Sequence, residues 1–284
     1  MFNRFSRYSL VSLLMLPFAV PAKDTIMWQT YHRPPGTFNY GENKGQGFVQ
    51  KSLQMIIERM PEYQHEMPVT TLARATSDIQ AGKQACHPAL YITDERKKHM
   101  VFSNASILNS NTRVITKPEK IAPFLENGQV NLKKILQQDS LIFGHVKNRS
   151  YGDEIDSIFN KYNHAKNIIQ VDNIDLKRIF QMIERDRVDV SIAYPFEIQY
   201  YLDKNPQSVG QLAAYPIANI PLYNTGAVAC PKNAWGKKII QQVNTILKEI
   251  KPTAEYRQAL TIWRENERNS PLFNQYYREY FLKH

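Results

Sequence analysis

The chain has 284 residues, of which 43% are hydrophobic and 22% charged, with 11 glycines and 16 prolines. These proportions are ordinary for a globular protein, so they exclude collagen-like, low-complexity and wholly disordered chains. At about 150 residues per domain, the length predicts one large domain or two small ones.

The formal net charge is +10, and the basic residues are dispersed along the sequence, with short clusters at Arg96-Lys97-Lys98 and Lys237-Lys238. A nucleic-acid-binding surface needs a continuous basic stripe with interleaved aromatic residues, so we expect no nucleic-acid partner. The excess of positive charge favours anionic partners instead.

The first 22 residues differ in character from the rest. Arg4 and Arg7 precede an apolar run from Leu10 to Val20, and Pro21-Ala22 completes a site of small residues for cleavage. This pattern is typical of a secretory signal peptide, and the run is shorter than the ~20 apolar residues of a membrane-spanning helix. We therefore expect residues 1–22 to be removed on export, which leaves a soluble periplasmic protein without stable membrane insertion.

Residues 25–92 alternate between the strand and helix periods. Residues 25–31 predict a strand, and the apolar positions between Val49 and Met60 fall on one face of a helix that Pro61 ends. A strand at 63–69, a helix that begins at 72 and an extended segment at 84–92 follow. This β-α-β-α-β order predicts a mainly parallel sheet with helices on its faces.

A second α/β series follows an interruption at 102–121. It has predicted strands at 141–143, 168–171 and 188–192, each followed by a helix. The last predicted strand, 225–230, precedes two helices separated by Pro252. One strand and two helices cannot bury both faces of a sheet, so this segment must return to the first unit.

The fold class that we expect is therefore α/β, with two lobes joined by two crossover strands near 111–116 and 216–223. One lobe contains residues 23–112 and 224–284, and the other contains residues 113–223. The cleft between two such lobes is the natural place for a ligand.

Motifs for catalysis and metal binding are absent from the sequence. It has no G-x-S-x-G, H-E-x-x-H or C-x-x-C motif, and no glycine-rich nucleotide fingerprint. None of the seven histidines has another four residues away, the helical spacing of a metal site. We therefore predict no catalytic residue, no metal and no cofactor.

Only two cysteines occur, Cys86 and Cys230. An even pair in an oxidising compartment is a candidate disulfide, and two buried thiols are the alternative. Composition alone leaves both possibilities open.

An ordered set of short motifs spans the first predicted unit. These motifs are Gly45-Gln46-Gly47-Phe48, Ile79-Gln80-Ala81-Gly82-Lys83, Ala89-Leu90-Tyr91-Ile92-Thr93-Asp94-Glu95-Arg96 and Val101-Phe102-Ser103. Their order and spacing resemble those of the family 3 extracellular solute-binding proteins, the polar-amino-acid group of type 2 periplasmic binding proteins. Within that group the chain resembles a divergent proteobacterial branch that has Trp-Gly near the last strand, here Trp235-Gly236. The resemblance implies a Venus flytrap fold, in which hinge motion closes two lobes on a small ligand.

The resemblance also implies a set of ligand-binding residues. Arg96 matches the arginine that holds the ligand's α-carboxylate, a task suited to the planar fork of a guanidinium. Ser150 falls near the second carboxylate-binding segment, and Tyr31 near the aromatic residue that covers the ligand. Ala89 and Tyr91 stand where amino-acid binders have small or hydroxyl residues.

One departure from the family pattern changes the expected ligand. The aspartate that binds a ligand's ammonium group is replaced by Tyr194, and a tyrosine is neutral near pH 7. Glu197, one helical turn later, is the residue that could compensate. We therefore expect a small ligand that is anionic (carboxylate-bearing) or aromatic, rather than an ordinary amino acid.

The family topology bears on the cysteines and on the partners. It places the strand of Cys86 beside the returning strand of Cys230, in antiparallel order, which favours a disulfide between them. It also implies a monomer that delivers its ligand to an ABC importer permease or to a membrane sensor.

Two alternative functions stay open. One is a periplasmic enzyme on the same fold, of a dehydratase-like kind. The other is a degenerate binder that serves as a protein-interaction module, docking a partner through the aromatic residues of 276–281.

Overall fold

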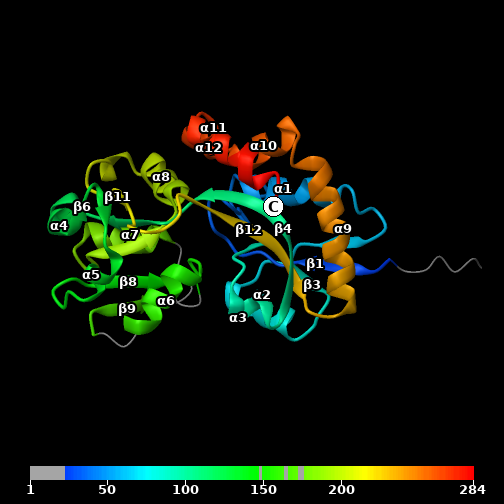
Figure 1. Ribbon diagram of the computed structural model, residues 1–284, viewed down its shortest axis with the longest axis horizontal. Coiled ribbons are helices and arrows are strands. Elements are labelled where there is room, and N and C mark those ends of the chain that lie inside the picture. The colour runs from blue at the N-terminus through cyan, green and yellow to red at the C-terminus, as the bar shows by residue number, and fades with distance from the viewer. Residues whose placement is uncertain (1–22, 147–148, 163–165, 172–175) are drawn as a thin grey trace, which may run out of the picture.

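Two α/β lobes lie side by side, connected by extended strands, in the computed structural model (Figure 1). The structure describes residues 23–146, 149–162, 166–171 and 176–284. The expected signal peptide, residues 1–22, lies outside the described residues. Among the described helices, none combines the length and apolar composition that a bilayer crossing requires.

The first lobe is built on a five-stranded sheet in the order β2-β1-β3-β12-β4. Its strands come from both ends of the chain, because the last strand returns after the second lobe is complete. Its elements are β1 (Thr25–Trp28), α1 (Phe48–Ile57), β2 (Gln64–Glu66), α2 (Leu72–Gln80), β3 (Ala85–Leu90), α3 (Asp94–Lys97), β4 (Met100–Ser110), β12 (Tyr223–Pro231), α9 (Ala234–Ile250), α10 (Ala254–Thr261), α11 (Glu265–Arg268), α12 (Pro271–Tyr276) and the π-helical turn Tyr277–Phe281.

The second lobe is built on a five-stranded sheet in the order β11-β5-β10-β8-β9 and carries a small β6-β7 hairpin. Its elements are β5 (Arg113–Thr116), α4 (Pro118–Ile121), a 3₁₀ turn (Ala122–Phe124), β6 (Leu125–Glu126), β7 (Gln129–Val130), α5 (Leu132–Leu136), β8 (Phe143–Val146), α6 (Asp153–Tyr162), β9 (Ile168–Val171), α7 (Leu176–Glu184), β10 (Val190–Ala193), α8 (Pro195–Lys204), a 3₁₀ turn (Pro206–Ser208) and β11 (Ala213–Pro216).

The two-lobed α/β architecture with mainly parallel sheets is as expected: in each sheet four of the five strands run in one direction, and a single strand runs against them. In the first sheet β1 pairs in parallel with β2 and β3, whereas β12 is antiparallel to both β3 and β4. In the second sheet β8 is parallel to its neighbours β9 and β10, whereas β5 is antiparallel to its neighbours β10 and β11. The reason is the double crossover: one long strand leaves a lobe and its partner returns beside it in the opposite direction.

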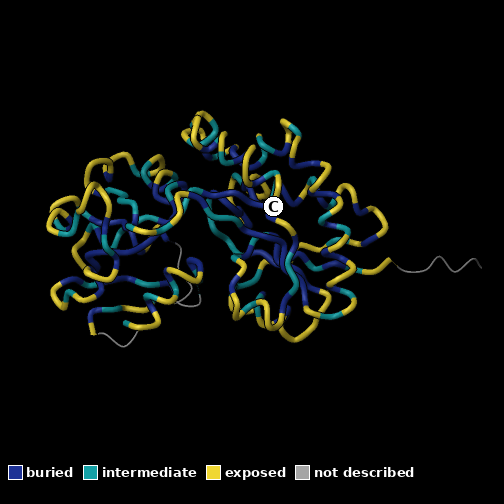
Figure 2. The backbone as a smooth tube through the Cα atoms, viewed as in Figure 1, coloured by how far each residue is buried: buried dark blue, intermediate teal, exposed yellow. Residues whose placement is uncertain are grey.

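Each lobe has its own hydrophobic core, and buried residues also continue along the strands that join the lobes (Figure 2). The first core gathers Trp28, Leu53, Val228 and Val243 between its sheet and helices α1 and α9. The second lobe has two clusters, around Phe143 and around Phe180, one on each face of its sheet.

The aromatic C-terminal segment packs into the first core. Phe273, Tyr277 and Phe281 are at most 4% exposed, and the Tyr277 hydroxyl donates to the Lys251 carbonyl at 2.6 Å. Tyr280 is 39% exposed. Most of the aromatic surface of this segment is therefore used inside the lobe.

Cys86 on β3 and Cys230 on β12 form a disulfide, with their Cα atoms 4.4 Å apart. The expected disulfide is thus confirmed. It links residues 144 positions apart in sequence and ties the returning segment to the first half of the same lobe.

Candidate functional site

The structure brings the six predicted ligand-binding residues to one pocket at the junction of the lobes. They are Tyr31, Ala89, Tyr91, Arg96, Ser150 and Tyr194. The pocket has a volume of about 40 Å³, which accommodates little more than a few water molecules. Admission of a larger molecule therefore requires the lobes or the lining side chains to move.

Arg96 reaches the pocket from the short helix α3. The Thr93 hydroxyl caps this helix by accepting from the Arg96 backbone N–H at 3.3 Å, and Nη1 of the guanidinium donates to the Tyr91 carbonyl at 2.9 Å. Burial lowers the pKa of Arg96, but an arginine remains protonated in proteins. Its remaining N–H groups make it a fixed cationic donor in the wall of the pocket.

Tyr31 and Arg33 are held by the loop that follows β1. The Thr37 hydroxyl donates to the Tyr31 carbonyl at 2.5 Å and accepts from the Arg33 backbone N–H at 3.1 Å. The Arg33 guanidinium lies 5.9 Å from the centre of the Tyr31 ring. Sequence reasoning identified Tyr31 but missed Arg33, which also lines the pocket.

Tyr91 and Tyr194 meet across the junction of the lobes. Tyr91 follows β3 in the first lobe, Tyr194 follows β10 in the second, and their rings stack 6.5 Å apart at 15°. Burial raises the pKa of Tyr194 to about 12 and raises the pKa of Tyr91 well above its ordinary value. Both phenols are therefore neutral near pH 7.

Ser150 lines the pocket, but its hydroxyl hydrogen is already used. The hydroxyl donates to Asp156 Oδ2, and the Tyr151 backbone N–H donates to the other oxygen of Asp156 at 2.8 Å. Burial raises the pKa of Asp156. In this arrangement Ser150 offers an acceptor oxygen to the pocket rather than a free donor.

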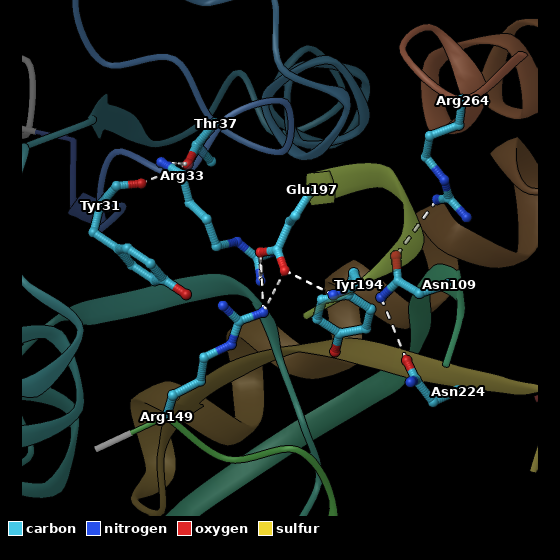
Figure 3. Close-up of polar contacts among 9 residues, drawn as sticks. All are labelled: Tyr31, Arg33, Thr37, Asn109, Arg149, Tyr194, Glu197, Asn224 and Arg264. Atoms are coloured by element: carbon cyan, nitrogen blue, oxygen red, sulfur yellow. Dashed lines mark hydrogen bonds and ion pairs between the residues drawn. The ribbon is translucent and has the colours of Figure 1, made fainter. Parts of the chain in front are cut away.

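Three charged residues converge beside Tyr194 (Figure 3). Nη2 of Arg149 donates to both carboxylate oxygens of Glu197, at 2.9 and 2.7 Å, and Nη1 of Arg33 lies 3.6 Å from Glu197. The side chains of Arg149 and Glu197 are only 7% and 1% exposed. Burial opposes the charge of Arg149, and the Glu197 carboxylate outweighs it, so the pKa of Arg149 is raised.

Glu197 also caps the start of helix α8, where its Oε2 accepts from the Tyr194 backbone N–H at 2.9 Å. Its two oxygens are thus occupied by Arg149, Arg33 and this N–H. The possibility that Glu197 replaces the missing aspartate as a free carboxylate does not fit this geometry.

Arg33 and Arg149 were missed because no family position that we matched carries an arginine there. The available signal was weak: Arg149 directly precedes Ser150, and Arg33 directly precedes a Pro-Pro pair. Neither sequence feature indicates that both guanidinium groups meet one carboxylate.

A second polar group lies on the other side of Tyr194 from Arg33 and Arg149, at the paired strands β4 and β12 (Figure 3). The fully buried Arg264 donates from Nη1 to the Leu108 carbonyl at 2.8 Å and to Asn109 Oδ1 at 3.4 Å. Asn109, which lines the pocket, donates in turn to Asn224 Oδ1 at 3.5 Å. These contacts hold the Asn109 amide, which faces the pocket, between the two crossover strands β4 and β12.

His87 lies beneath the pocket on β3 and is 5% exposed. Its Nδ1 accepts from the Ala89 N–H at 3.1 Å, and burial together with Arg96 and Arg33 lowers its pKa to about 3. It is therefore neutral at ordinary pH. Within the described ranges, no group of His, Cys, Asp and Glu side chains is arranged to hold a metal ion.

Comparisons with known proteins agree with this architecture. The model of the bacterial extracellular solute-binding proteins, family 3, matches residues 26–266. No curated protein is similar to the chain in sequence.

Many solved structures share the fold at low sequence identity. An ancestral arginine-binding protein bound to glutamine has a TM-score of 0.65 and 18% identity, over 85% of this chain and 98% of that one. A histidine kinase sensor domain with similarity to periplasmic binding proteins has a TM-score of 0.68 and 11% identity, over 85% and 96%. An amino acid ABC transporter substrate-binding protein from Streptococcus pneumoniae, bound to L-arginine, has a TM-score of 0.64 and 16% identity, over 84% and 94%.

Proposed function

Because the chain belongs to the bacterial extracellular solute-binding proteins of family 3, we propose that it captures a small carboxylate-bearing anion in the pocket between its lobes. The residues that hold this ligand are Arg96, Tyr31, Ala89, Tyr91, Ser150 and Tyr194, together with Arg33 and Arg149.

The charge of the pocket is the observation that carries this proposal. Among the described residues, its lining contains Arg33, Arg96 and Arg149 and no aspartate or glutamate. Glu197, which contacts two of these arginines, offsets a single positive charge. The excess of guanidinium groups suits a ligand with one or two carboxylates, because each guanidinium can donate two parallel hydrogen bonds to a carboxylate.

An ordinary amino acid fits this pocket poorly. Its ammonium group would lie among cations, next to a neutral Tyr194 and a Glu197 whose oxygens are occupied. An unpaired buried charge costs several kcal/mol, on the order of 3 to 5. The rings of Tyr31, Tyr91 and Tyr194 provide apolar walls, so an aromatic acid is a suitable ligand as well as an aliphatic one.

The proposal includes no chemical reaction. Among the described lining residues there is no carboxylate or imidazole that could exchange a proton with the ligand. The similar structures include an ABC transporter substrate-binding protein and a histidine kinase sensor domain. We therefore assign the periplasm as the compartment, and an importer permease or a membrane sensor as the recipient of the ligand.

Calorimetry and thermal shift on residues 23–284 test this function. The ligand panel contains aliphatic dicarboxylates, aromatic monocarboxylates and the common L-amino acids. We expect carboxylates without an ammonium group to raise the melting temperature, because they bind the folded state alone. Micromolar binding of L-arginine or L-glutamine, with no response to the acids, would overturn the proposal.

Arg96→Gln is the variant that tests the site. We expect it to weaken carboxylate binding by at least about 30-fold, since a charge-assisted bidentate contact is lost. The matched control is Arg59→Gln, which removes an arginine from an exposed ion pair with Glu249 and should leave the affinity unchanged.

A further inference from the structure

A second concave surface lies in the first lobe, outside the lining of the interlobe pocket. It is a groove of about 690 Å³ bounded by α9, the first half of β4 and the last residues of the chain. We call it the α9 groove. Its volume is within the range of small-molecule sites, roughly 300 to 1,000 Å³.

The α9 groove has apolar parts and a basic rim. Apolar side chains from all three of its elements line it, namely Phe102 on β4, Ile240 and Leu247 on α9 and Leu282 near the C-terminus. The exposed Lys237, Lys248 and Lys283 stand around it. Among the described residues that line the groove there is no aspartate or glutamate.

Lys251 is the unusual residue of this groove. It is only 4% exposed, and its ammonium group lies 4.3 Å from the centre of the Phe281 ring. Among the described residues, no carboxylate or hydrogen-bond acceptor contacts this ammonium group. Buried charges in proteins are ordinarily paired, because removal of a charge from water is costly.

The loss of hydration disfavours the charged form of this lysine, so burial lowers the pKa of Lys251 to about 8. The cation–π contact with Phe281 compensates for part of the lost hydration. An anion in the groove would supply the missing counter-charge at a site where solvent screening is reduced.

We propose that the α9 groove binds an amphipathic anion, whose acidic head group pairs with Lys251 and whose apolar chain lies against Phe102, Ile240 and Leu282. The head group is a carboxylate or a phosphate, and the exposed lysines of the rim attract it electrostatically. This site is independent of the interlobe pocket and of the function proposed for that pocket.

Decanoate is the probe for the test, titrated into residues 23–284 by calorimetry. We expect saturable binding that Lys251→Met weakens by at least about ten-fold. Methionine retains the unbranched stem of lysine, so its packing on Phe281 should be preserved. Lys238→Met is the matched control, because Lys238 is also on α9 and over an aromatic ring, that of Tyr63, but does not line the groove.

A double variant tests the same site without altering a buried residue, so its result does not depend on the packing around Lys251. Lys237→Glu with Lys283→Glu alters two exposed positions and should also weaken decanoate binding. Decanoate binding that persists in Arg96→Gln, whose interlobe pocket is impaired, belongs to the α9 groove, and this component should be lost in Lys251→Met; this separates the two sites. Equal decanoate affinity of the wild-type chain and Lys251→Met would overturn the proposal, and so would a failure of both millimolar decanoate and anionic phosphatidylglycerol vesicles to bind.

Vesicles distinguish the two sources of such an anion. If the head group belongs to a membrane lipid, the chain will bind phosphatidylglycerol vesicles and not phosphatidylcholine vesicles, and Lys251→Met will abolish that binding. If the ligand is a free acid, decanoate will bind and the vesicles will not. Both results support the site. Vesicle binding that Lys251→Met leaves intact, without binding of decanoate, contradicts it.

Discussion

One guanidinium nitrogen of Arg149 donates to both carboxylate oxygens of Glu197, at 2.9 and 2.7 Å, where the two side chains are 7% and 1% exposed. Arg33 approaches the same carboxylate from the other lobe at 3.6 Å. A single acid therefore partly neutralises two arginines from separate halves of the molecule. This relationship determines both the charge of the interlobe pocket and the stability of its wall.

Removal of the Glu197 charge should destabilise the protein strongly. Glu197→Gln leaves the buried Arg149 without its counter-charge, and we expect the free energy of unfolding to fall by about 3 to 5 kcal/mol. Urea denaturation measures this change. The double variant Arg149→Met with Glu197→Gln should lose less than the single one, because it contains no buried unpaired guanidinium at position 149.

The exposed pair of Arg59 and Glu249 provides the control. Glu249→Gln should cost no more than about 1 kcal/mol, as is usual for surface ion pairs. If Glu197→Gln costs as little as this control, the buried pair does not have the role in stability that we assign to it.

Loss of the disulfide should lower stability through the unfolded state. Cys86→Ala with Cys230→Ala opens a loop of 144 residues, and we expect a decrease of about 2 to 5 kcal/mol in the free energy of unfolding. The wild-type chain should show the same decrease in reductant, and the variant should show no further change. A melting temperature of the wild-type chain that does not respond to a complete loss of the disulfide would contradict this prediction.

Acidification should destabilise the folded chain between pH 7 and pH 5. Burial lowers the pKa of His87 from 6.5 to about 3 and that of His145 to about 4. Below pH 6.5 the unfolded chain binds protons that the folded chain cannot, so the free energy of unfolding falls as the pH falls. His87 should contribute about 2 kcal/mol of this decrease, and the less buried His145 a smaller amount.

His87→Asn checks the assignment, because an amide oxygen can replace Nδ1 as the acceptor of the Ala89 N–H. Urea denaturation at pH 7 and pH 5 should show a smaller pH dependence for this variant than for the wild-type chain. An unchanged pH dependence would mean that His87 is not the titrating group.

Lys251→Met should stabilise the unliganded protein at pH 7. The pKa of Lys251 is lowered from 10.5 to about 8, so the folded state bears a full charge penalty below pH 8. This penalty is relieved as the pH rises toward 10.5, where the unfolded chain also loses the proton. We expect a gain of about 1 to 2 kcal/mol, less than the full pKa difference implies because the ammonium group opens to the groove.

Measurements at pH 7 and pH 10 separate this effect from packing. The advantage of Lys251→Met over the wild-type chain should be smaller at pH 10. A difference that is the same at both pH values would show that the side chain's packing, and not its charge, is responsible.

Much of the fold follows from local patterns. The apolar period between Val49 and Met60 corresponds to α1, and the strand predicted at 225–230 corresponds to β12, which returns to the first sheet. The antiparallel placement of β12 beside β3 was expected from the family topology and not from these local patterns, because strand direction depends on where the chain re-enters a sheet and not on which faces it buries.

The residues of the interlobe pocket also fall into those that the sequence predicted and those that it did not. Residues such as Arg96 and Tyr91 could be identified because they lie within a short ordered motif, where the backbone alone determines their direction. Arg33, Arg149 and Glu197 are separated by more than a hundred residues at their extremes. For Lys251, no carboxylate of the described residues contacts the ammonium group, and this depends on the segments that pack around it. The periodicity of apolar residues indicates whether a side chain points inward. The packing of the two lobes then determines which distant charged residue that side chain contacts.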